Sequence, residues 1–499
     1  MNTRRTGTRR MSRPQTACIR FGLVCLAFVI YLWICGHWHH RSTKWEILVD
    51  GLAESLGHPN FLNIRVYERD LPQHSLPKFL YGGTERPRYV FFANAVNGLG
   101  WNNVLQEQLL NAHLAHLSQR AYVFPDFAPS DHPPFPDKLV NGSRHLLHIP
   151  MNALLSGPTA GGGLSSDGKD DLSRRAVSEK WWDVACPRSE VVVLNVQQTM
   201  REMSLDAASD GKEILTKWVQ KLASISDPCV SVEDGSVFDY ELFNSDRLLS
   251  IWPSYSQSPI LENFAWSPLI TAAIFRNFHL FSADPPPDFL TPHEGNRPHG
   301  FTNFLPLPVS EQPIFGLLAI HVRRGDYEAQ CKLLANSSAD FCGWNALGTL
   351  DYPLHPSKYA LGPQIPTQLD ISDAEWREGG TLHHCWPSPE SIVARLHTVR
   401  RDAILMRGQK LQKLYIATNG DSVWLRNLVQ MLVADGWDNV SSSFDMELEL
   451  EERAVAQAVD MAVLTAAEVF IGNGFSSMTS NVVQTRLAGG RDRRTINFW

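Results

Sequence analysis

The feature that most constrains the fold is an alternation of short apolar strands with helices, which occurs twice along the chain. Strands that alternate with helices are joined by crossovers and form parallel sheets. The first copy contains, in order, a strand at Tyr89–Ala93, a loop with Gly98 and Gly100, a helix from about Asn102 to Gln119 with helical apolar periodicity, and a strand at Ala121–Phe124. This is a βαβ unit whose glycine loop follows the carboxyl end of its first strand.

A second copy fills the C-terminal part of the chain. Its members are a strand at Leu317–Val322, a helix at about Ser391–Met406, a strand at Leu414–Ala417, a helix at about Ser422–Ala434, a long helix around Leu448–Ala466, a strand at Glu468–Ile471 and a helix from about Ser476 to Leu487. The two copies predict an α/β fold of two Rossmann-like domains that face each other across a cleft. We expect an N-terminal Rossmann-like domain at residues 86–305, with a flexible Gly- and Ser-rich insertion near 156–175, and a C-terminal Rossmann-like domain at 306–499.

Charge or glycine directly follows a predicted strand at three places. These are NGLGWNN at Asn97–Asn103, HVRRGDY at His321–Tyr327 and FIGNGFSSMTSN at Phe470–Asn481. In the third segment Ser476 and Ser477 open a helix, whose free N–H groups and positive dipole end suit a phosphate. The alternative is that Ser476 only caps the helix.

The arginines of HVRRGDY follow a buried strand and permit three interpretations. A guanidinium group at a strand end can bind two phosphate oxygens at once. A surface ion pair with Asp326 explains the same residues without a ligand. The tripeptide Arg324-Gly325-Asp326 also permits an adhesion function, which would require an exposed hairpin tip; the preceding buried strand argues against it.

The order of these segments resembles the GDP-fucose protein O-fucosyltransferase family, with kinship to the α1,6-fucosyltransferases that share a strand-end His-x-Arg motif. GLGWNN resembles the family's Gly-rich loop, HVRRGDY its central His-x-Arg segment, and residues 458–486 its nucleotide-binding segment. The Gly-rich loop departs from the commoner form, with Gly100 and Trp101 where phenylalanine and glycine are usual. The resemblance implies a GT-B fold, inversion at the sugar and an active site that needs no metal.

The resemblance also implies a role for individual residues. Arg323 would bind the β-phosphate and stabilise the leaving nucleotide, and Asn102 would lie near the sugar and the acceptor. Donor-binding residues would be Gly98 and Gly100 in the loop, Asp460 at the guanine or ribose, Ser476, Ser477 and Thr479 at the phosphates, and His321 and Asp326, which would shape the loop around Arg323. Breaking a glycosyl–phosphate bond develops negative charge on the pyrophosphate, and without a metal an arginine and a helix N-terminus must stabilise it.

The acceptor must also lose a proton to a general base. Glu107 lies one helical turn after Asn103 and is our candidate catalytic base. The alternative interpretation of Glu107 is a carboxylate on a solvated helix face.

The N-terminus resembles a signal anchor. Arginines precede the first acidic residue, at Arg4, Arg5, Arg9, Arg10, Arg13 and Arg20, and the apolar segment Phe21–Trp38 follows. Such a segment rises about 27 Å as a helix, barely enough to span a bilayer, and the upstream arginines place residues 1–20 in the cytosol. A cleaved signal peptide is the alternative, but no small-x-small cleavage site follows Trp38. We therefore expect a single-pass type II membrane protein of the Golgi or endoplasmic reticulum, with a stem at residues 39–85.

Cysteines and glycosylation sequons agree with a luminal setting. The sequons begin at Asn141, Asn336 and Asn439. We expect disulfides between Cys186 and Cys229, and between Cys331 and either Cys342 or Cys385. Five cysteines lie outside the anchor region, so at least one of them has no partner within the chain.

The net charge of −7 argues against a nucleic-acid partner, which would require a basic face.

Our leading interpretation is a membrane glycosyltransferase that moves fucose from GDP-fucose to a protein hydroxyl or a glycan, without a metal or another cofactor. The alternatives are a transferase that uses another GDP-sugar and a catalytically silent GT-B protein that binds glycans or acts as a chaperone.

Overall fold

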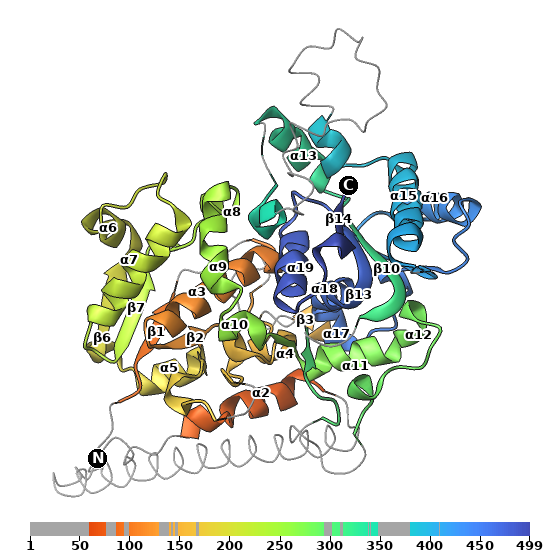
Figure 1. Cartoon of the computed structure of the whole chain (residues 1–499). Helices are drawn as coiled ribbons and strands as arrows, with labels where there is room; N and C mark the ends of the chain where they lie inside the picture. Colours follow the sequence, from red (N-terminus) through yellow and green to blue (C-terminus); the bar gives the residue numbers. More distant parts are fainter. Residues whose placement is uncertain are drawn as a thin grey trace, which may run out of the picture. The chain divides into compact units, whose positions relative to one another are not determined.

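The computed structural model in Figure 1 describes most of the chain after residue 58. The described residues are 59–75, 86–93, 99–128, 139–140, 143–144, 148–165, 169–293, 302–309, 313–337, 339, 341–347, 380–408 and 410–499. Residues His58–Trp499 form one compact unit. The predicted anchor at residues 21–38 lies outside the described residues, and none of the helices within them is long and apolar enough to cross a membrane.

The N-terminal half of this unit contains a five-stranded parallel sheet in the order β5-β2-β1-β7-β6. Its strands are β1 (Tyr89–Phe92), β2 (Ala121–Phe124), β5 (Val177–Ser178), β6 (Val191–Asn195) and β7 (Cys229–Glu233). Helix α3 (Trp101–Leu117) connects β1 with β2, as the sequence predicts. The predicted strands Tyr89–Ala93 and Ala121–Phe124 are thus confirmed.

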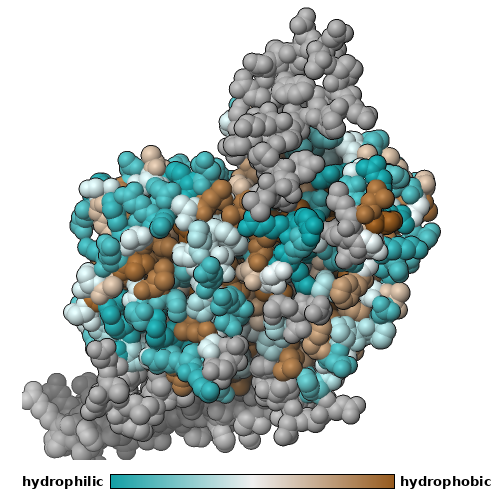
Figure 2. All heavy atoms as spheres, viewed as in Figure 1, coloured by the Kyte–Doolittle hydropathy of each residue, from teal (hydrophilic) through white to brown (hydrophobic). Residues whose placement is uncertain are grey.

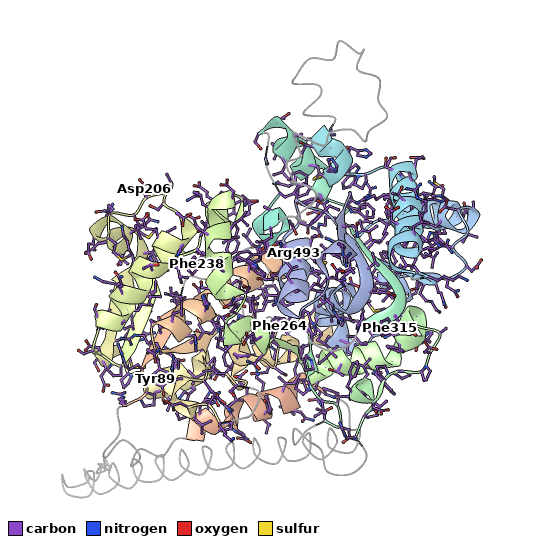
Figure 3. All side chains as sticks on the ribbon, in the orientation of Figure 1. Tyr89, Asp206, Phe238, Phe264, Phe315 and Arg493 are labelled. Atoms are coloured by element: carbon purple, nitrogen blue, oxygen red, sulfur yellow. A yellow bond between two sulfur atoms is a disulfide. The ribbon has the colours of Figure 1, made fainter. Side chains whose placement is uncertain are left out.

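The C-terminal half contains a second five-stranded parallel sheet in the order β12-β11-β10-β13-β14. Its strands are β10 (Ile314–Val322), β11 (Lys413–Thr418), β12 (Val440–Ser442), β13 (Ala467–Gly472) and β14 (Ile496–Phe498). Strand β10 starts at the surface, where Phe315 is 63% exposed (Figure 3), and is buried from Leu317 to Val322. The α/β class with parallel sheets is therefore confirmed.

The chain leaves β10 in one direction, through β11 to β12, and later returns to its other side as β13. The strand order therefore reverses between β10 and β13. In open α/β sheets, ligands bind outside the carboxyl ends of the strands at such a switch point. The segments that follow Val322 and Gly472 lie at this position.

Helices cover both sheets, and their boundaries largely agree with the periodicity of the sequence. In the C-terminal half these are α13 (Tyr327–Asn336), α15 (Pro389–Arg407), α16 (Ser422–Ala434), α17 (Leu450–Ala454), α18 (Ala456–Ala466) and α19 (Ser477–Ala488). Helix α15 begins at its cap Ser388, with Pro389 in the first turn, and ends at Gly408 in the left-handed region with a φ of 66°. The single helix predicted around Leu448–Ala466 is instead two helices, because buried Val455 leaves helical geometry, with a φ of −110° and a ψ of 16°.

Shorter elements surround the first sheet and lead to the second. The helices are α4 (Met151–Leu154), α5 (Glu179–Ala185), α6 (Val196–Glu202), α7 (Gly211–Ser224), α8 (Tyr240–Phe243), α9 (Trp252–Tyr255), α10 (Pro259–Glu262), α11 (Pro268–Arg276) and α12 (Phe278–Phe281). Two further antiparallel pairs join β3 (Leu139–Val140) with β4 (Ser143–Arg144) and β8 (Ala265–Trp266) with β9 (Leu307–Pro308). On the face shown in Figure 2, polar and apolar residues are interspersed.

The start of the predicted flexible insertion near 156–175 is packed in the interior. Pro158, Thr159 and Ala160 are buried and form a short 3₁₀ turn that contacts α3. A Cβ atom on Gly157 would lie 2.7 Å from the carbonyl oxygen of Asn263, so only glycine permits this approach. In the sequence these glycines indicate flexibility, whereas in the structure Gly157 allows close packing.

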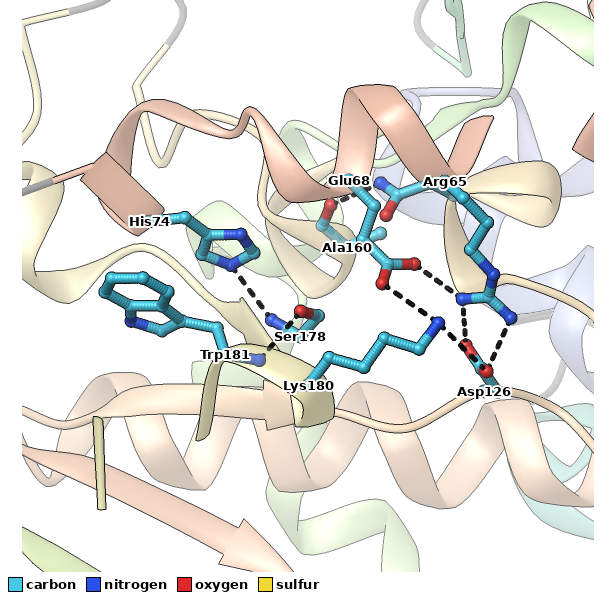
Figure 4. A network of polar contacts seen from close by, with 9 residues as sticks. Arg65, Glu68, His74, Asp126, Ala160, Ser178, Lys180 and Trp181 are labelled. Carbon is cyan, nitrogen blue, oxygen red and sulfur yellow. Dashed lines mark hydrogen bonds and ion pairs between the residues drawn. The ribbon is translucent and has the colours of Figure 1, made fainter. Parts of the chain in front are cut away.

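Part of the predicted stem also packs against the first sheet. Helix α2 (Phe61–Arg69) is capped by Asn60, and its Phe61 and Ile64 are buried in the core. Figure 4 shows how its polar side is held: Arg65 forms a double hydrogen bond with Asp126, at 2.6 and 2.5 Å, and another with Glu68. Residues 61–75 thus belong to the compact unit, while the domain boundary near residue 305 stays a prediction.

Candidate functional site

The carboxyl ends of β10, β11 and β13 bring together three polar loops. The loop after β10 carries Arg323, and it connects to the loop after β13 through Tyr327, whose hydroxyl donates to the carbonyl oxygen of Phe475 at 2.6 Å. The guanidinium carbon of Arg323 lies 5.6 Å from the centre of the Tyr327 ring. The segments HVRRGDY and FIGNGFSSMTSN, which are about 150 residues apart, therefore meet at the switch point, as the sequence predicts.

Arg323 forms the ion pair with Asp326 that the sequence suggested as an alternative, at 3.0 Å. Its side chain is 34% exposed and that of Asp326 is 75% exposed. An ion pair in such exposed surroundings contributes only about 0–1 kcal/mol, so an anionic ligand can displace the carboxylate at little cost. Arg323 is therefore accessible, and its ion pair is compatible with phosphate binding.

The backbone on both sides of Arg323 is fixed by residues from the end of β11. The hydroxyl of Thr418 donates to the carbonyl oxygen of Val322 at 2.7 Å. The side chain of Asn419 accepts from the backbone N–H of Arg324 at 2.7 Å and donates to its carbonyl oxygen at 3.0 Å. Neither residue is among those predicted from the sequence, although TNGD at a strand end is the same signal that identified the other loops.

Arg324 is buried and does not point into solvent. Its guanidinium carbon lies 4.3 Å from the ring centre of Trp386 and 4.5 Å from that of Trp424, and the group donates to the carbonyl oxygen of Pro387. Burial lowers the pKa of Arg324 to about 10, so it stays charged at neutral pH. Since an adhesion motif must be exposed and only 5% of Arg324 is, the Arg-Gly-Asp interpretation is wrong.

His321 is a buried residue of β10 that joins this strand to α19. Its Nδ1 atom lies 3.0 Å from the hydroxyl oxygen of Thr479, which also accepts from the backbone N–H of Asn473 at 3.1 Å. Burial, and next the charge of Arg323, lower the pKa of His321 to about 3, so the imidazole is neutral. Thr479 is fully buried, so its hydroxyl holds the loop in place.

Helix α19 presents its N-terminus to the same loops. Ser476 is the N-cap residue, but its side chain makes no capping hydrogen bond. Its hydroxyl therefore does not serve the capping role that we considered as an alternative. Ser477 is half-buried in the first turn. The positive end of a helix dipole and its N–H groups favour an anion at this position.

Asp460 lies in α18 beneath the end of β11. Its carboxylate accepts from the hydroxyl of Tyr415 at 2.6 Å and from that of Ser443 at 3.0 Å. Burial raises the pKa of Asp460 to about 6 despite these two hydrogen bonds. Ser443 also accepts from the backbone N–H of Thr418 at 3.2 Å, which connects Asp460 to the loop beside Arg323.

These loops lie in a segment that known proteins share. Residues 315–488 match the model of the GDP-fucose protein O-fucosyltransferase family. The match covers roughly a third of the chain, and over this C-terminal part the chain is similar to that family. The family consists of glycosyltransferases, and the matched residues run from β10 to α19.

Solved structures of one protein, POFUT1, are similar to the chain. The complex with GDP-fucose has a TM-score of 0.46 and 14% sequence identity over 84% of this chain and 99% of that one. The complex with GDP has a TM-score of 0.47 and 14% identity over 83% and 98%, and a second crystal form with GDP-fucose has 0.48 and 13% over the same shares. No curated protein sequence matches the chain.

Asn102 connects the first half of the chain to the segment that matches the family model. It lies in the first turn of α3, after the cap residue Gly100, and is buried. Asn481 of α19 donates to the backbone oxygen of Asn102 at 2.8 Å and to its side-chain oxygen at 3.1 Å. The side chain of Asn102 is thus engaged in a contact between helices. Gly98 of the same loop lies outside the described residues.

Glu107 is buried, with 1% of its surface exposed, so the alternative of a solvated helix face is wrong. Five residues rotate a helix by about 140° beyond a full turn, which places Glu107 and Asn102 on different sides of α3. Burial, and next the charge of Glu107, raise the pKa of Tyr122 in β2, so Glu107 faces the first sheet. Nothing in its position favours Glu107 as the general base.

The cysteines form disulfides between Cys186 and Cys229 and between Cys331 and Cys385, and Cys342 is a buried free thiol. The first pairing is confirmed, and Cys385 is the partner that the sequence left open.

Of the predicted sequons, Asn336 and Asn439 are exposed, and Asn141 lies outside the described residues. Among the described residues, no group of three or more His, Cys, Asp or Glu side chains is arranged to hold a metal ion.

Proposed function

We propose that this chain is an inverting, metal-independent glycosyltransferase with a GT-B fold, which moves fucose from GDP-fucose to a protein hydroxyl or a glycan. The observation that carries the proposal is the position of Arg323. An accessible guanidinium group and the N-terminus of α19 lie on neighbouring loops of the switch point, within a segment of the O-fucosyltransferase family.

In this proposal, Arg323 exchanges the Asp326 carboxylate for the β-phosphate of the donor. Negative charge grows on the pyrophosphate as the bond to the sugar breaks. A guanidinium group that is already positioned, together with a helix N-terminus, stabilises that charge without a metal. His321 takes no proton at neutral pH, because its pKa is far lower, and it serves to position Thr479.

The nucleoside would lie over the end of β11. Asp460 would accept hydrogen bonds from the guanine or ribose, with Tyr415 and Ser443 orienting its carboxylate. Because the pKa of Asp460 is raised to about 6, the carboxylate is mostly ionised at neutral pH and can accept such bonds. Ser476 and Ser477 would contact the phosphates.

Asn102 would lie near the sugar and the acceptor only if its contact with Asn481 opens or if its backbone takes part. The contact of the Asn102 side chain with Asn481 is the one observation that favours the alternative of a catalytically silent, glycan-binding protein. A transferase that uses another GDP-sugar is a further alternative, since recognition of the nucleotide does not fix the sugar.

The setting in the cell is part of the proposal. The apolar segment at residues 21–38 and its upstream arginines support a type II anchor in the Golgi or endoplasmic reticulum. The exposed sequons at Asn336 and Asn439 and the disulfides support a luminal location for the enzyme.

Thermal unfolding in the presence of GDP, UDP and ADP tests the donor. A ligand that binds only the folded state increases the free energy of unfolding, by about 2.7 kcal/mol at a concentration of one hundred times its Kd, and so raises the melting temperature. We expect a shift with GDP and GDP-fucose and little with UDP or ADP. No shift with GDP at millimolar concentration contradicts the proposal. Release of GDP from GDP-fucose, compared with GDP-mannose, distinguishes the fucosyltransferase from its alternatives.

A further inference from the structure

We propose that the segment Cys385-Trp386-Pro387, tethered by the disulfide to Cys331, positions both loops of the donor site. This inference rests on the proposed function for its catalytic consequence. The three residues of this segment lie outside the two loops, and they would position the loops without touching the donor.

The first set of contacts is with the loop after β10. Trp386 stacks on the guanidinium group of Arg324 at 4.3 Å, and the carbonyl oxygen of Pro387 accepts a hydrogen bond from the same group. Arg324 directly follows Arg323. Its backbone is already held by Asn419, so the segment fixes the side chain while Asn419 fixes the main chain.

The second set of contacts is with the loop after β13. The side chain of Asn473 donates to the carbonyl oxygen of Cys385 at 2.7 Å and accepts from the backbone N–H of Phe475 at 3.0 Å. Phe475 precedes Ser476, the cap of α19. A single stretch of three residues therefore contacts the loop of the arginine and the loop of the helix N-terminus.

The disulfide is what ties this segment to the site. Cys331 lies in α13, which begins at Tyr327 immediately after the arginine loop, and it is 54 residues away from Cys385 in sequence. Without the covalent bond, only noncovalent contacts hold the segment against the two loops. Since both cysteines are fully buried, the bond lies within the packed interior, next to the site that it supports.

The other disulfide supplies a matched control. Cys186–Cys229 closes a loop of similar length, with a separation of 43 residues, and lies beside the first sheet. Loss of either disulfide removes a comparable constraint on the unfolded chain. Only loss of Cys331–Cys385 should disturb the donor loops.

The experiment compares C331A/C385A with C186A/C229A in the full-length protein. Hydrogen exchange is measured without ligand for peptides that cover residues 321–327 and 472–477, and GDP affinity is measured by calorimetry. We expect faster exchange in both peptides and an affinity for GDP lower by about tenfold, which corresponds to about 1.4 kcal/mol, in C331A/C385A alone. Equal exchange and equal affinity in the two double variants would overturn the inference.

A milder variant covers the case in which C331A/C385A does not fold. Trp386→Leu removes the stack on Arg324 and keeps the disulfide, and Trp181→Leu is its control, because Trp181 stacks on His74 at 5.2 Å in the first half. Faster exchange at residues 321–327 in Trp386→Leu alone supports the inference, and identical exchange in the two variants contradicts it. If the wild-type protein binds no GDP, the proposed function fails, while the exchange data still decide whether the segment positions the loops.

Discussion

The Nδ1 atom of His321 lies 3.0 Å from the hydroxyl oxygen of Thr479, and this contact joins the central strand β10 to helix α19. Both residues are buried, and the tryptophan at the C-terminus, Trp499, also donates to the backbone oxygen of His321 at 3.0 Å. The strand that positions Arg323 and the helix proposed to face the phosphates are therefore connected by a neutral histidine.

This histidine makes stability depend on pH. The pKa of His321 falls from 6.5 to about 3 on folding, so between these values the unfolded chain binds more protons than the folded one. Stability should therefore be fully retained above about pH 6.5 and decrease as pH falls toward 3. In His321→Asn the unfolding free energy should depend less on pH, so the amount by which the wild type is more stable should shrink from pH 7.5 to pH 5. Urea unfolding of both proteins at both pH values measures this difference. An advantage that grows toward pH 5 would show that His321 is charged when folded.

Substitution of Arg323 should affect catalysis more than folding. Loss of one preorganised donor to a developing charge typically costs about 3–4 kcal/mol in the transition state, so Arg323→Ala should lower kcat by roughly two to three orders of magnitude. Arg323→Lys keeps the charge without the two-pronged geometry and should recover only part of the rate. Single-turnover release of GDP from GDP-fucose measures both.

The control for Arg323 is Arg401→Ala. Arg401 forms a similar exposed ion pair with Asp402, at 3.4 Å on α15. Its loss should leave kcat unchanged. The free energy of unfolding of Arg323→Ala should stay within about 1 kcal/mol of that of the wild type. Near-normal transfer by a folded Arg323→Ala protein would exclude its role.

Substitution of Asn481 should lower the free energy of unfolding more than substitution of Asn102. Asn481→Ala removes two hydrogen bonds to Asn102 and one from Gln484, at 2.7 Å, and leaves buried polar groups unpaired. The cost should be about 1–3 kcal/mol, whereas Asn102→Ala removes only the longer bond and should cost less. Denaturant unfolding of the two single variants and of the double variant gives their coupling.

Asn427→Ala is the control for this pair, because Asn427 is exposed on α16 and should change stability by less than about 0.5 kcal/mol. Asn102→Ala also tests catalysis. A large fall in kcat with little change in stability would show that Asn102 leaves Asn481 to act on the substrate.

Arg324 should behave as a structural residue. Its guanidinium group lies between two indole rings, so Arg324→Ala should destabilise the protein by about 2–4 kcal/mol. Arg400 provides the comparison, because within the described part of the chain it lies over a single indole ring, at 4.4 Å from the centre of Trp437. Arg400→Ala should cost about 1 kcal/mol. Similar losses for both variants would show that the second ring contributes nothing.

Cys342 should be unreactive in the folded protein. Burial raises the pKa of its thiol to about 12, and the thiolate is the species that reacts. Iodoacetamide at pH 8 should leave Cys342 unmodified until urea is added, as measured by mass spectrometry of the Cys342 peptide. Rapid alkylation without denaturant would contradict its burial. The same digest should show the peptides of Cys331 and Cys385 joined.

The strands and most helices could be predicted because each leaves a local signal. Leu317–Val322 is a continuous apolar run, as expected of a strand buried on both faces. Arg324 shows where such signals end: the carbonyl group that it contacts belongs to Pro387, 63 residues away, and no pattern in the sequence pairs them. The burial of Glu107 could not be predicted for a related reason. Helix α3 is covered by the first sheet and by α19, so even its polar residues are buried.

The N-terminal half of helix α19 contacts two parts of the chain for which we propose different tasks. Its first turn adjoins the arginine loop, and one turn further on Asn481 is bonded to α3, which starts at the loop proposed to lie near the acceptor. Any ligand that displaces this helix must either carry α3 along or break a buried amide contact. Occupancy of the proposed nucleotide site would therefore affect the proposed acceptor side without a hinge, through the rigidity of one helix.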